Sequence, residues 1–433
     1  MTRDEILLAS KQFLFPAVFH YYQEPLVIER AKDQYVWDAD GAQYLDFFGG
    51  IVTVSVGHLN DYVRARIHEQ VDRLHHVSTL FPTGPQADLA RTIAGITPGG
   101  ALTKSFFTNS GTEANETAIM LARCYTGNSE IIALRHSYHG RSSLGATLTG
   151  QGPWRGSAPP QPGIVHAHNA YCYRCPFGLT YPSCEVKCAR DVEDLIRTTT
   201  TGQIAAFIGE PIQGIGGFIT PPPEYFRIVH EIVRDHGGIF ISDEVQTGLG
   251  RTGDKWFGIE HYGVVPDVIT GAKGLANGLP IGVTTARAEI ADSMRFLTLS
   301  TFGGNPVSTT AAKAVIDFVK NENLLENCSR VGGYLRERLL ELQEKYTLIG
   351  DVRGRGLMQA LELVKDLATK EPAAEETAAL MEAARRHHLL IGKGGLYANV
   401  IRITPPMNIG TADVDECILR LDASLGEITS QRR

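Results

Sequence analysis

The sequence predicts an α/β protein with a large domain, built on a mostly parallel central sheet, and a smaller α+β domain formed from both ends of the chain. Two observations predict this division. Short β-branched runs alternate with helical patterns over the middle of the chain, and strands separated by helices form crossover units and a mostly parallel sheet. After about residue 315 this alternation stops, and longer helical patterns are followed by short strands.

The strands predicted for the large domain each end in a polar or glycine-rich turn, and helical patterns at 113–125 and 225–235 lie between some of them. We predict these strands at residues 105–107, 131–134, 204–208, 239–241 and 268–269. Ligands of parallel sheets bind beyond the carboxyl ends of the strands. The polar residues that follow each strand are therefore the candidate site residues.

Both ends of the chain are expected to form the small domain. Its helices are predicted at 311–320, 331–345 and 375–386, and its strands at 357–364 and 400–403. The N-terminal part holds short strands near 26–29, 35–38 and 44–46, which are too few to form a domain alone. We therefore predict that residues 1–65 join the small domain, that 66–314 form the large domain, and that 315–433 complete the small domain.

The composition excludes several classes of protein. The 433 residues carry a net charge of −7, and this balance does not favour the basic face of a nucleic-acid binder. No apolar run reaches the roughly 18 residues that a membrane helix needs. Residues 1–10 resemble neither a secretory signal nor a transit peptide. We expect a cytoplasmic protein that binds neither nucleic acid nor membrane.

Four of the seven cysteines are close together in the sequence, within a stretch rich in tyrosine, proline and glycine. They are Cys172, Cys175, Cys184 and Cys188. Four thiolates can hold a structural zinc ion, although the eight-residue gap between the two pairs is short for the usual zinc spacing. The alternative is a set of reduced thiols in a surface insertion. We expect no metal and keep the four cysteines as the candidate zinc site.

A lysine between small residues is the first candidate for chemistry. Lys273 follows the predicted strand 268–269, and Gly271, Ala272 and Gly274 leave space around it. A partly desolvated lysine can lose its proton and attack a carbonyl, as a Schiff base to pyridoxal phosphate (PLP) requires. Lys393 also has small neighbours, but it lacks the further residues described next.

Asp243 directly follows the predicted strand 239–241, thirty residues before Lys273. A carboxylate at this strand end can hold the proton of a pyridinium ring and keep that ring an electron sink. Gln246 lies three residues further and could donate a hydrogen bond to the phenolic oxygen of the cofactor. A helix cap or a metal carboxylate is the alternative for Asp243 alone.

A phosphate-binding helix start is predicted at Ser110, Gly111 and Thr112. These residues follow a short strand and open a helix, where backbone N–H groups and hydroxyls bind phosphate. A plain helix cap is the alternative. The sequence lacks the Gly-x4-Gly-Lys-Ser/Thr pattern of a nucleotide phosphate loop, and it has no convincing dinucleotide-binding glycine pattern.

Two further strands are followed by candidate site residues. Tyr138 comes after the strand 131–134 and could stack on a flat ring, unless it is a core aromatic residue. Glu210 comes after the strand 204–208, and Pro211 forces it into an extended conformation that suits the end of a strand.

These motifs, in this order, resemble those of the class III aminotransferases, which belong to the fold-type I PLP-dependent transferases. The resemblance covers nearly the whole chain. It also rests on the segments 40–46, 301–306 and 402–406. Within the family, residues 50–58, 301–324 and 350–354 are most similar to the group of alanine–glyoxylate aminotransferases and ω-transaminases.

The resemblance implies a role for each residue at the predicted sheet edge. Lys273 forms the Schiff base with PLP and moves the substrate proton, and Asp243 pairs with the ring nitrogen. Gln246 contacts the phenolic oxygen, Tyr138 stacks on the ring, and Glu210 supports the site near Asp243.

It also implies a homodimer with shared active sites, or a tetramer of such dimers. Ser110, Gly111 and Thr112 bind the phosphate of the cofactor in their own subunit. Thr301 reaches the phosphate in the neighbouring subunit.

For the substrate, the resemblance implies that Arg402 binds a carboxylate through its guanidinium group. Several ω-amino-acid members carry a glutamate that pairs with this arginine, but this chain has Ile215 at that position. Arg402 should therefore stay available for carboxylates. Tyr21 and Tyr22 are expected to approach the pocket and limit the size of the substrate, with core packing as the alternative.

The function that follows is PLP-dependent transfer of an amino group from alanine, β-alanine or another ω-amino donor to pyruvate or glyoxylate. One alternative is a lyase that acts on an amino-alcohol phosphate. Another is an ω-amino-acid transaminase that uses 2-oxoglutarate. A non-catalytic relative that binds the cofactor without turnover is a further alternative.

Overall fold

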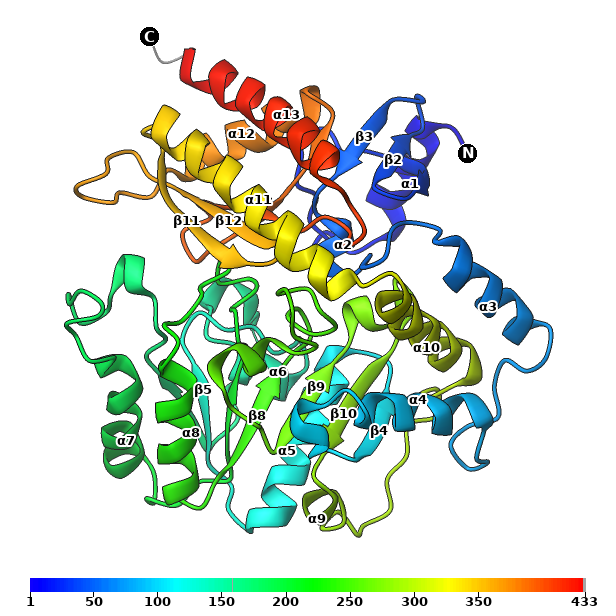
Figure 1. The fold of residues 1–433 in the computed structure, drawn as a ribbon, viewed down its shortest axis with the longest axis vertical. Helices are drawn as coiled ribbons and strands as arrows, with labels where there is room; N and C mark the ends of the chain where they lie inside the picture. Colours follow the sequence, from blue (N-terminus) through cyan, green and yellow to red (C-terminus); the bar gives the residue numbers. More distant parts are fainter. Residues whose placement is uncertain (158, 431–433) are drawn as a thin grey trace.

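The computed structural model describes residues 1–157 and 159–430 of the chain. In this part, the larger unit is built on a seven-stranded sheet (Figure 1). The strands lie in the order β4 (Lys104–Thr108), β10 (Gly282–Ala286), β9 (Val268–Gly271), β8 (Ile239–Asp243), β7 (Ala206–Gly209), β5 (Ile131–Leu134) and β6 (Ile164–Ala167). Strand β10 is antiparallel to both of its neighbours, and the remaining pairs are parallel. The predicted mostly parallel sheet is confirmed.

Helices cover both faces of this sheet, so its central strands are buried on two sides. Alternate residues of a strand point to opposite faces, which is why Phe207 and Ile208 belong to different hydrophobic clusters. One cluster includes α4 (Gly84–Ala94), α7 (Lys187–Thr199), α8 (Tyr225–Asp235) and α10 (Pro306–Asn321). The other includes α5 (Gly111–Thr126), α6 (Ser143–Leu148) and α9 (Ala288–Ala291). Burial on both faces explains the continuous apolar runs that reveal these strands in the sequence.

The smaller unit contains an antiparallel sheet and three helices. The sheet order is β11 (Ile349–Arg355), β12 (Met358–Leu363), β15 (Val400–Ile403) and β14 (Gly392–Gly394). The helices are α11 (Leu324–Lys345), α12 (Ala374–Arg386) and α13 (Thr411–Ser430). Figure 1 shows this unit above the larger sheet, with the N-terminal strands beside it.

The N-terminal segment packs with the C-terminal part of the chain. Its strands β1 (Ile28–Lys32), β2 (Tyr35–Asp38) and β3 (Gln43–Asp46) form a sheet with β13 (Leu389–Leu390), which pairs in parallel with β3. Helix α10 contributes Ala314 and Val315 to the core of the small unit and Ala311 to that of the large unit. The predicted boundary after residue 314 falls inside this helix, and the domain limits stay a prediction.

Helix α1 (Arg3–Phe13) is an element for which the sequence analysis predicted no structure. It begins with a capping box between Thr2 and Glu5, yet none of its residues is buried. The short helices α2 (Gly49–Val52) and α3 (Asp61–Val71) complete the N-terminal part. None of the helices in residues 1–157 and 159–430 combines the length and the apolar character that a bilayer-spanning helix needs.

A buried group of charged residues joins the cysteine-containing segment to the small unit. Glu362 is fully buried on β12 and accepts hydrogen bonds from Tyr171 and Arg174. Oε2, the oxygen that accepts from Tyr171, is also 2.6 Å from Nη1 of Arg353, and Nε of Arg353 donates to the carbonyl of Gly217 at 2.8 Å. A buried carboxylate needs such partners because removal from water is costly for a charge.

We expect Glu362→Gln to lower the melting temperature clearly, because it leaves Arg174 without its anionic partner and weakens the pairing of Arg353. Breaking a buried ion pair costs about 3–5 kcal/mol. The matched control is Glu341→Gln, which breaks an exposed pair with Arg338 worth about 0–1 kcal/mol. Thermal unfolding of both variants checks this, and equal melting temperatures would contradict the assigned role of Glu362.

Candidate active site

The carboxyl ends of the central strands open onto a cavity of about 340 Å³. The end of each strand supplies part of its wall, as expected for a parallel sheet. Every residue that the sequence analysis assigned to the cofactor, apart from Thr301, lines this cavity: Ser110, Gly111, Thr112, Tyr138, Glu210, Asp243, Gln246 and Lys273. The structure therefore brings together residues that are up to 163 positions apart, from 110 to 273.

Lys273 follows β9 and faces the cavity with a half-buried side chain. Its φ of 43° lies in the left-handed region, which is unusual for a residue with a side chain and often marks a functional site. A Cβ atom on Gly274 would lie 2.1 Å from Oγ of Ser55, so a side chain at that position would displace the serine hydroxyl.

The surroundings of Lys273 favour its neutral, nucleophilic form. Burial lowers the pKa of its amine, and Asp243 and Glu210 act in the opposite direction. The positive charge of Arg402 adds to the lowering of this pKa. A lysine with a lowered pKa is suited to attack a carbonyl.

Asp243 ends β8 and is held by three hydrogen-bond partners. Its Oδ2 accepts from Nδ2 of Asn115 at 2.8 Å and is 2.7 Å from Nδ1 of His139. Its Oδ1 accepts from the backbone N–H of Val245 at 3.1 Å. Asn115 is itself oriented by Thr270, whose hydroxyl donates to Oδ1 of Asn115 at 2.7 Å. The carboxylate is thus fixed at the cavity wall.

Helix α5 begins at the cavity. Ser110 is its N-cap residue and accepts from the N–H of Glu113 at 3.3 Å. The first N–H groups of a helix have no partner within the helix and carry a partial positive charge. Gly111 and Thr112 provide such groups in the cavity wall, so this end can bind an anion such as phosphate.

Tyr138 and Glu210 form a second part of the wall. The N–H of Tyr138 donates to Oε1 of Glu210 at 2.9 Å, and the N–H of Gly214 donates to Oε2 at 2.8 Å. Burial raises the pKa of Glu210 to about 7. The ring of Tyr138 packs edge-on against Trp154, with ring centroids 5.7 Å apart.

Gln246 lines the cavity with a buried Oε1 atom that has no hydrogen-bond partner within the described residues. Buried polar atoms of native proteins are generally paired, so an unpartnered one at a cavity wall marks a contact for a ligand.

Arg402 lies on β15, 1% exposed, between two aromatic rings. Its guanidinium carbon is 5.1 Å from the ring centroid of Phe48 and 5.7 Å from that of Phe218. Its Nε donates to the carbonyl of Lys393 at 3.1 Å, whereas Nη1 is buried without a partner in the described part of the chain. The arrangement leaves a guanidinium N–H free for an incoming carboxylate.

The two N-terminal tyrosines have different surroundings. Burial lowers the pKa of Arg402, and the charge interaction with nearby Tyr21 opposes part of this effect. Tyr21 also packs on Phe48, with ring centroids 5.7 Å apart. Tyr22 instead lies against Arg385 of α12, at 5.3 Å. The structure thus places Tyr21 beside the arginine, and it gives no support to the predicted contact of Tyr22 with substrate.

Two other residues named in the sequence analysis lie outside the cavity wall. Thr301 is exposed in the loop that precedes α10 and does not line this cavity, so its contact with the phosphate stays a prediction. Lys393 lies on β14, where its carbonyl accepts from Arg402. Lys273, and not Lys393, lines the cavity, which favours Lys273 as the reactive lysine.

The four clustered cysteines all contribute to one cavity of about 20 Å³ below the segment 171–188. All four are free thiols. The described residues contain no group of three or more His, Cys, Asp or Glu side chains that could hold a metal ion. The zinc hypothesis for Cys172, Cys175, Cys184 and Cys188 therefore finds no support in the structure.

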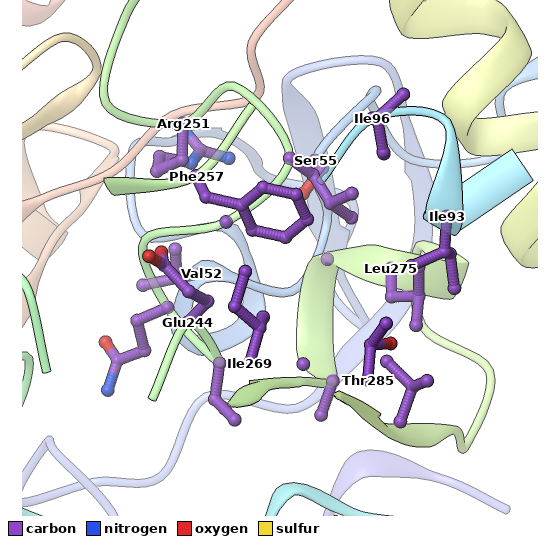
Figure 2. Close-up of a pocket in the computed structure, with 18 residues that line it drawn as sticks. Val52, Ser55, Ile93, Ile96, Glu244, Arg251, Phe257, Ile269, Leu275 and Thr285 are labelled. Atoms are coloured by element: carbon purple, nitrogen blue, oxygen red, sulfur yellow. The ribbon is translucent and has the colours of Figure 1, made fainter. Parts of the chain in front are cut away.

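A smaller cavity of about 30 Å³ lies behind the wall that contains Val245, Gln246 and Ala272 (Figure 2). Apolar side chains such as Ile93 and Leu275 make up much of its lining. The buried carboxylate of Glu244 lies there, but it already accepts from the N–H groups of Gly258 and Ile259. The carboxylate of Glu244 is therefore already satisfied by the protein.

Sequence reasoning assigned no role to Asn115 or His139, although both hold Asp243. Their bonds to Asp243 span 128 and 104 residues, so no local pattern links them to it. A signal exists for Asn115: it lies four residues after Gly111, one helical turn from the start of α5.

The residues of the cavity fit PLP. The cofactor has an aldehyde, a phosphate, a ring nitrogen and a phenolic oxygen. The cavity offers an amine with a lowered pKa, an open helix start, a buried carboxylate and an unpartnered amide oxygen beside a donor N–H₂ group. Lys273, Ser110–Thr112, Asp243 and Gln246 are the residues that would hold it.

We expect PLP to bond covalently to Lys273, because burial favours the neutral amine there. After incubation with PLP and reduction with borohydride, peptide mapping by mass spectrometry should find the label on the Lys273 peptide. Lys273→Ala should remove it, and the control Lys393→Ala should retain it. A label on Lys393 would overturn the assignment.

The comparisons with known proteins agree with this geometry. The family model "Aminotransferase class-III" matches residues 19–425. The mitochondrial alanine–glyoxylate aminotransferase 2 homolog 2 of Arabidopsis thaliana is 44% identical over 98% of this chain and 88% of its own length. The leucine/methionine racemase of Thermococcus litoralis is 38% identical over 99% of this chain and 97% of its own.

Among solved structures, an amine transaminase from an uncultivated Pseudomonas species, in its PLP-bound form, has a TM-score of 0.91 with 32% identity. The match covers 96% of this chain and 99% of that one. The fold is therefore the fold-type I architecture that the resemblance implied. The chain belongs to the class III aminotransferase family of PLP-dependent enzymes.

Proposed function

We propose that this enzyme moves an amino group from alanine, β-alanine or another ω-amino acid to pyruvate or glyoxylate. The observation that carries this choice of substrates is Arg402, a buried guanidinium group between Phe48 and Phe218 with a free N–H at Nη1. All of these substrates carry one carboxylate, which would pair with Arg402. A carboxylate bound there would be largely shielded from water, which strengthens the pairing.

The surroundings of Arg402 support monocarboxylate acceptors. Ile215 is close to it: the carbonyl of Ile215 accepts from Gly395 at 2.9 Å, and a Cβ atom on Gly394 would lie 3.0 Å from Cδ of Arg402 and 3.2 Å from the carbonyl oxygen of Ile215. The Ile215 side chain has no charge that could draw the guanidinium group away from a substrate. We therefore favour pyruvate or glyoxylate over 2-oxoglutarate.

Within the proposed reaction, each protein group has a separate task. PLP, when bound, supplies the electron sink for the carbon that loses its proton. Lys273 moves that proton, which is work for an amine with a lowered pKa. Asp243 holds the proton of the ring nitrogen, and Tyr138 covers a face of the ring. Arg402 holds the substrate carboxylate and so orients the amino group.

We further propose that the enzyme is a homodimer with shared active sites. Large apolar side chains are exposed along the N-terminal segment and near Thr301, including Phe13 (75%), Phe15 (83%) and Phe302 (62%). The N-terminal segment also forms a groove of about 600 Å³ with apolar walls. Contact with a second copy would cover these surfaces and bring Thr301 to the neighbouring phosphate site. A tetramer and a cytoplasmic location stay predictions.

Racemisation is a second candidate function, because a relative of 38% identity over nearly the whole chain is named a racemase. Racemisation would remove the proton on one side of the carbon with Lys273 and return a proton on the other side from a second donor, with PLP bound and without an oxo-acid acceptor. Transamination leaves the cofactor in its amine form, whereas racemisation leaves it unchanged. The two reactions are therefore distinguishable with one enzyme preparation.

The test is a half-reaction screen on the PLP-loaded enzyme. L-Alanine, β-alanine, 4-aminobutyrate, L-glutamate, 1-phenylethylamine and ethanolamine phosphate are added separately while the absorbance of the cofactor is recorded. We expect alanine or β-alanine to convert the cofactor to its amine form, and pyruvate or glyoxylate to restore it. Arg402→Met should slow the amino acids at least about tenfold, the worth of a charge-assisted hydrogen bond, and leave 1-phenylethylamine within about twofold.

Lys393→Met, on the strand next to Arg402, is the matched control and should react like the wild type. Faster conversion by glutamate than by alanine would contradict the proposed acceptors. Release of phosphate from ethanolamine phosphate would identify a lyase. Interconversion of alanine enantiomers without the amine form of the cofactor would identify a racemase.

A further inference from the structure

Arg251 is a buried arginine that has no acidic partner among residues 1–157 and 159–430. It is 2% exposed and lies at the wall of the smaller cavity, together with Glu244 and Phe257 (Figure 2). Its Nη1 donates to the carbonyl oxygens of Leu357, at 3.3 Å, and Pro405. Its Nη2 is buried and has no hydrogen-bond partner in the described part of the chain. Burial lowers the pKa of Arg251 to about 10.

A buried guanidinium group without a counter-charge costs free energy. An apolar side chain of similar size would avoid this cost. What the guanidinium group contributes in return is its two hydrogen bonds to carbonyl oxygens. Both carbonyls belong to the small unit. Leu357 immediately precedes β12, and Pro405 lies two residues after the end of β15. These strands pair, with Ala360 opposite Arg402. Arg251 therefore holds the end of the strand that carries Arg402.

The segment between Asp243 and Arg251 connects this contact firmly to the PLP-binding wall. Glu244, next to Asp243, accepts from the hydroxyl of Ser242 at 3.0 Å, from the hydroxyl of Thr247 and from the N–H of Ile259 at 2.9 Å. These bonds fix the conformation of the loop that leads from Asp243 to Arg251.

The backbone of Arg251 also lies close to the backbone of the small unit. The N–H of Leu357 donates to the carbonyl of Arg251 at 3.1 Å. Gly356 has a φ of 55°, and a Cβ there would lie 2.8 Å from the carbonyl oxygen of Arg251. The backbone segments at Arg251 and Gly356 approach so closely that neither can shift without the other.

A second set of contacts fixes the other side of the turn after β15. The N–H of Thr404 donates to the carbonyl of Phe47 at 2.7 Å, and its hydroxyl donates to the carbonyl of Phe48 at 3.0 Å. The ring of Phe48 lies against Arg402. The turn is thus held between Arg251 and the residues that pack on the substrate arginine.

We propose that Arg251 is a positioning residue for the substrate carboxylate: it keeps Arg402, on the small unit, at the correct place relative to Lys273 and Asp243, on the large unit. This inference rests on the proposed function of Arg402. Loss of the Arg251 contacts lets the turn at Pro405 move, and the guanidinium of Arg402 moves with it. Substrates with a carboxylate are affected, whereas amines without one do not use Arg402.

A purely structural role for Arg251 makes a different prediction. If Arg251 only stabilised the contact between the two units, its loss would lower the melting temperature and would reduce the turnover of all substrates alike. The comparison of substrate classes, instead of activity alone, therefore decides between the two roles.

The experiment measures KM and kcat of the PLP-loaded enzyme for β-alanine or L-alanine and for 1-phenylethylamine. Arg251→Met should raise KM for the amino acids at least about tenfold, the loss of about one charge-assisted hydrogen bond to the substrate, and change neither constant for 1-phenylethylamine by more than about twofold. Arg251→Lys cannot reach both carbonyls and should raise the same KM at least about fivefold. Arg287→Met is the control, since Arg287 pairs with Asp267 away from the cavity.

A double-mutant comparison shows whether Arg251 acts through Arg402. In an Arg402→Met background, Arg251→Met should change KM for the amino acids by less than about twofold. Equal losses for both substrate classes, an unchanged KM in a folded Arg251→Lys enzyme, or additive effects in the double variant would each overturn the proposal.

Calorimetric binding of propionate to the PLP-loaded protein gives a readout without turnover. Its dissociation constant should rise in Arg251→Lys and Arg402→Met but not in Arg287→Met. If the wild type transaminates no donor but propionate binding follows this pattern, the proposed function is wrong and the positioning role stands. If transamination occurs and propionate binding ignores Arg251, the positioning role is wrong.

Discussion

A buried carboxylate is the constraint on which the site depends. Asp243 is 3% exposed, and removing a carboxylate from water is costly unless hydrogen bonds replace the lost hydration. Asn115, His139 and the N–H of Val245 provide those bonds. They come from helix α5, from the loop after β5 and from the loop after β8. Satisfying one carboxylate therefore fixes three segments of the cavity wall relative to one another.

The same arrangement places the start of α5, the anion-binding end of the cavity, at a defined position relative to Lys273. Asn115 links the two, since it bonds to Asp243 and accepts from Thr270 on β9, three residues before the lysine. The chemistry of the large unit is thus built on one hydrogen-bonded group. The small unit adds Arg402, and with it the choice of substrate. Contacts between the two units, such as those of Arg251, connect the substrate-binding arginine of the small unit to the reactive groups of the large unit.

Much of this could be predicted from the sequence where local signals are strong. Strands β5 and β8 are apolar because both of their faces are buried, and the candidate residues follow the ends of the strands. The sequence analysis missed strand β10 because it contains Thr284 and Thr285. These polar residues are typical of a loop, but in the structure they are buried. Their hydroxyls bond to the carbonyl of Ala114 and to Ser105, partners that are 170 and 180 residues away.

The parts that escaped prediction depend on such distant partners. Nothing near His139 in the sequence shows that its ring will meet Asp243. Nothing near Arg251 shows that its acceptors will be carbonyls 106 and 154 residues further along the chain. Tyr21 and Tyr22 are neighbours with the same chemistry, and only the packing of α12 separates their roles. Residue type predicts the chemistry at a strand end, whereas tertiary contacts decide which side chains support it.

The most direct test of this account is the protonation state of the cofactor's ring nitrogen. The enzyme is loaded with PLP labelled with ¹⁵N in the ring, and the nitrogen chemical shift is measured by NMR near neutral pH. The account predicts the shift of a protonated pyridinium in the wild type and in the control Lys393→Ala, and that of a neutral pyridine in Asp243→Asn. A neutral ring nitrogen in the wild type would contradict the role given to Asp243 and to the hydrogen-bonded group around it.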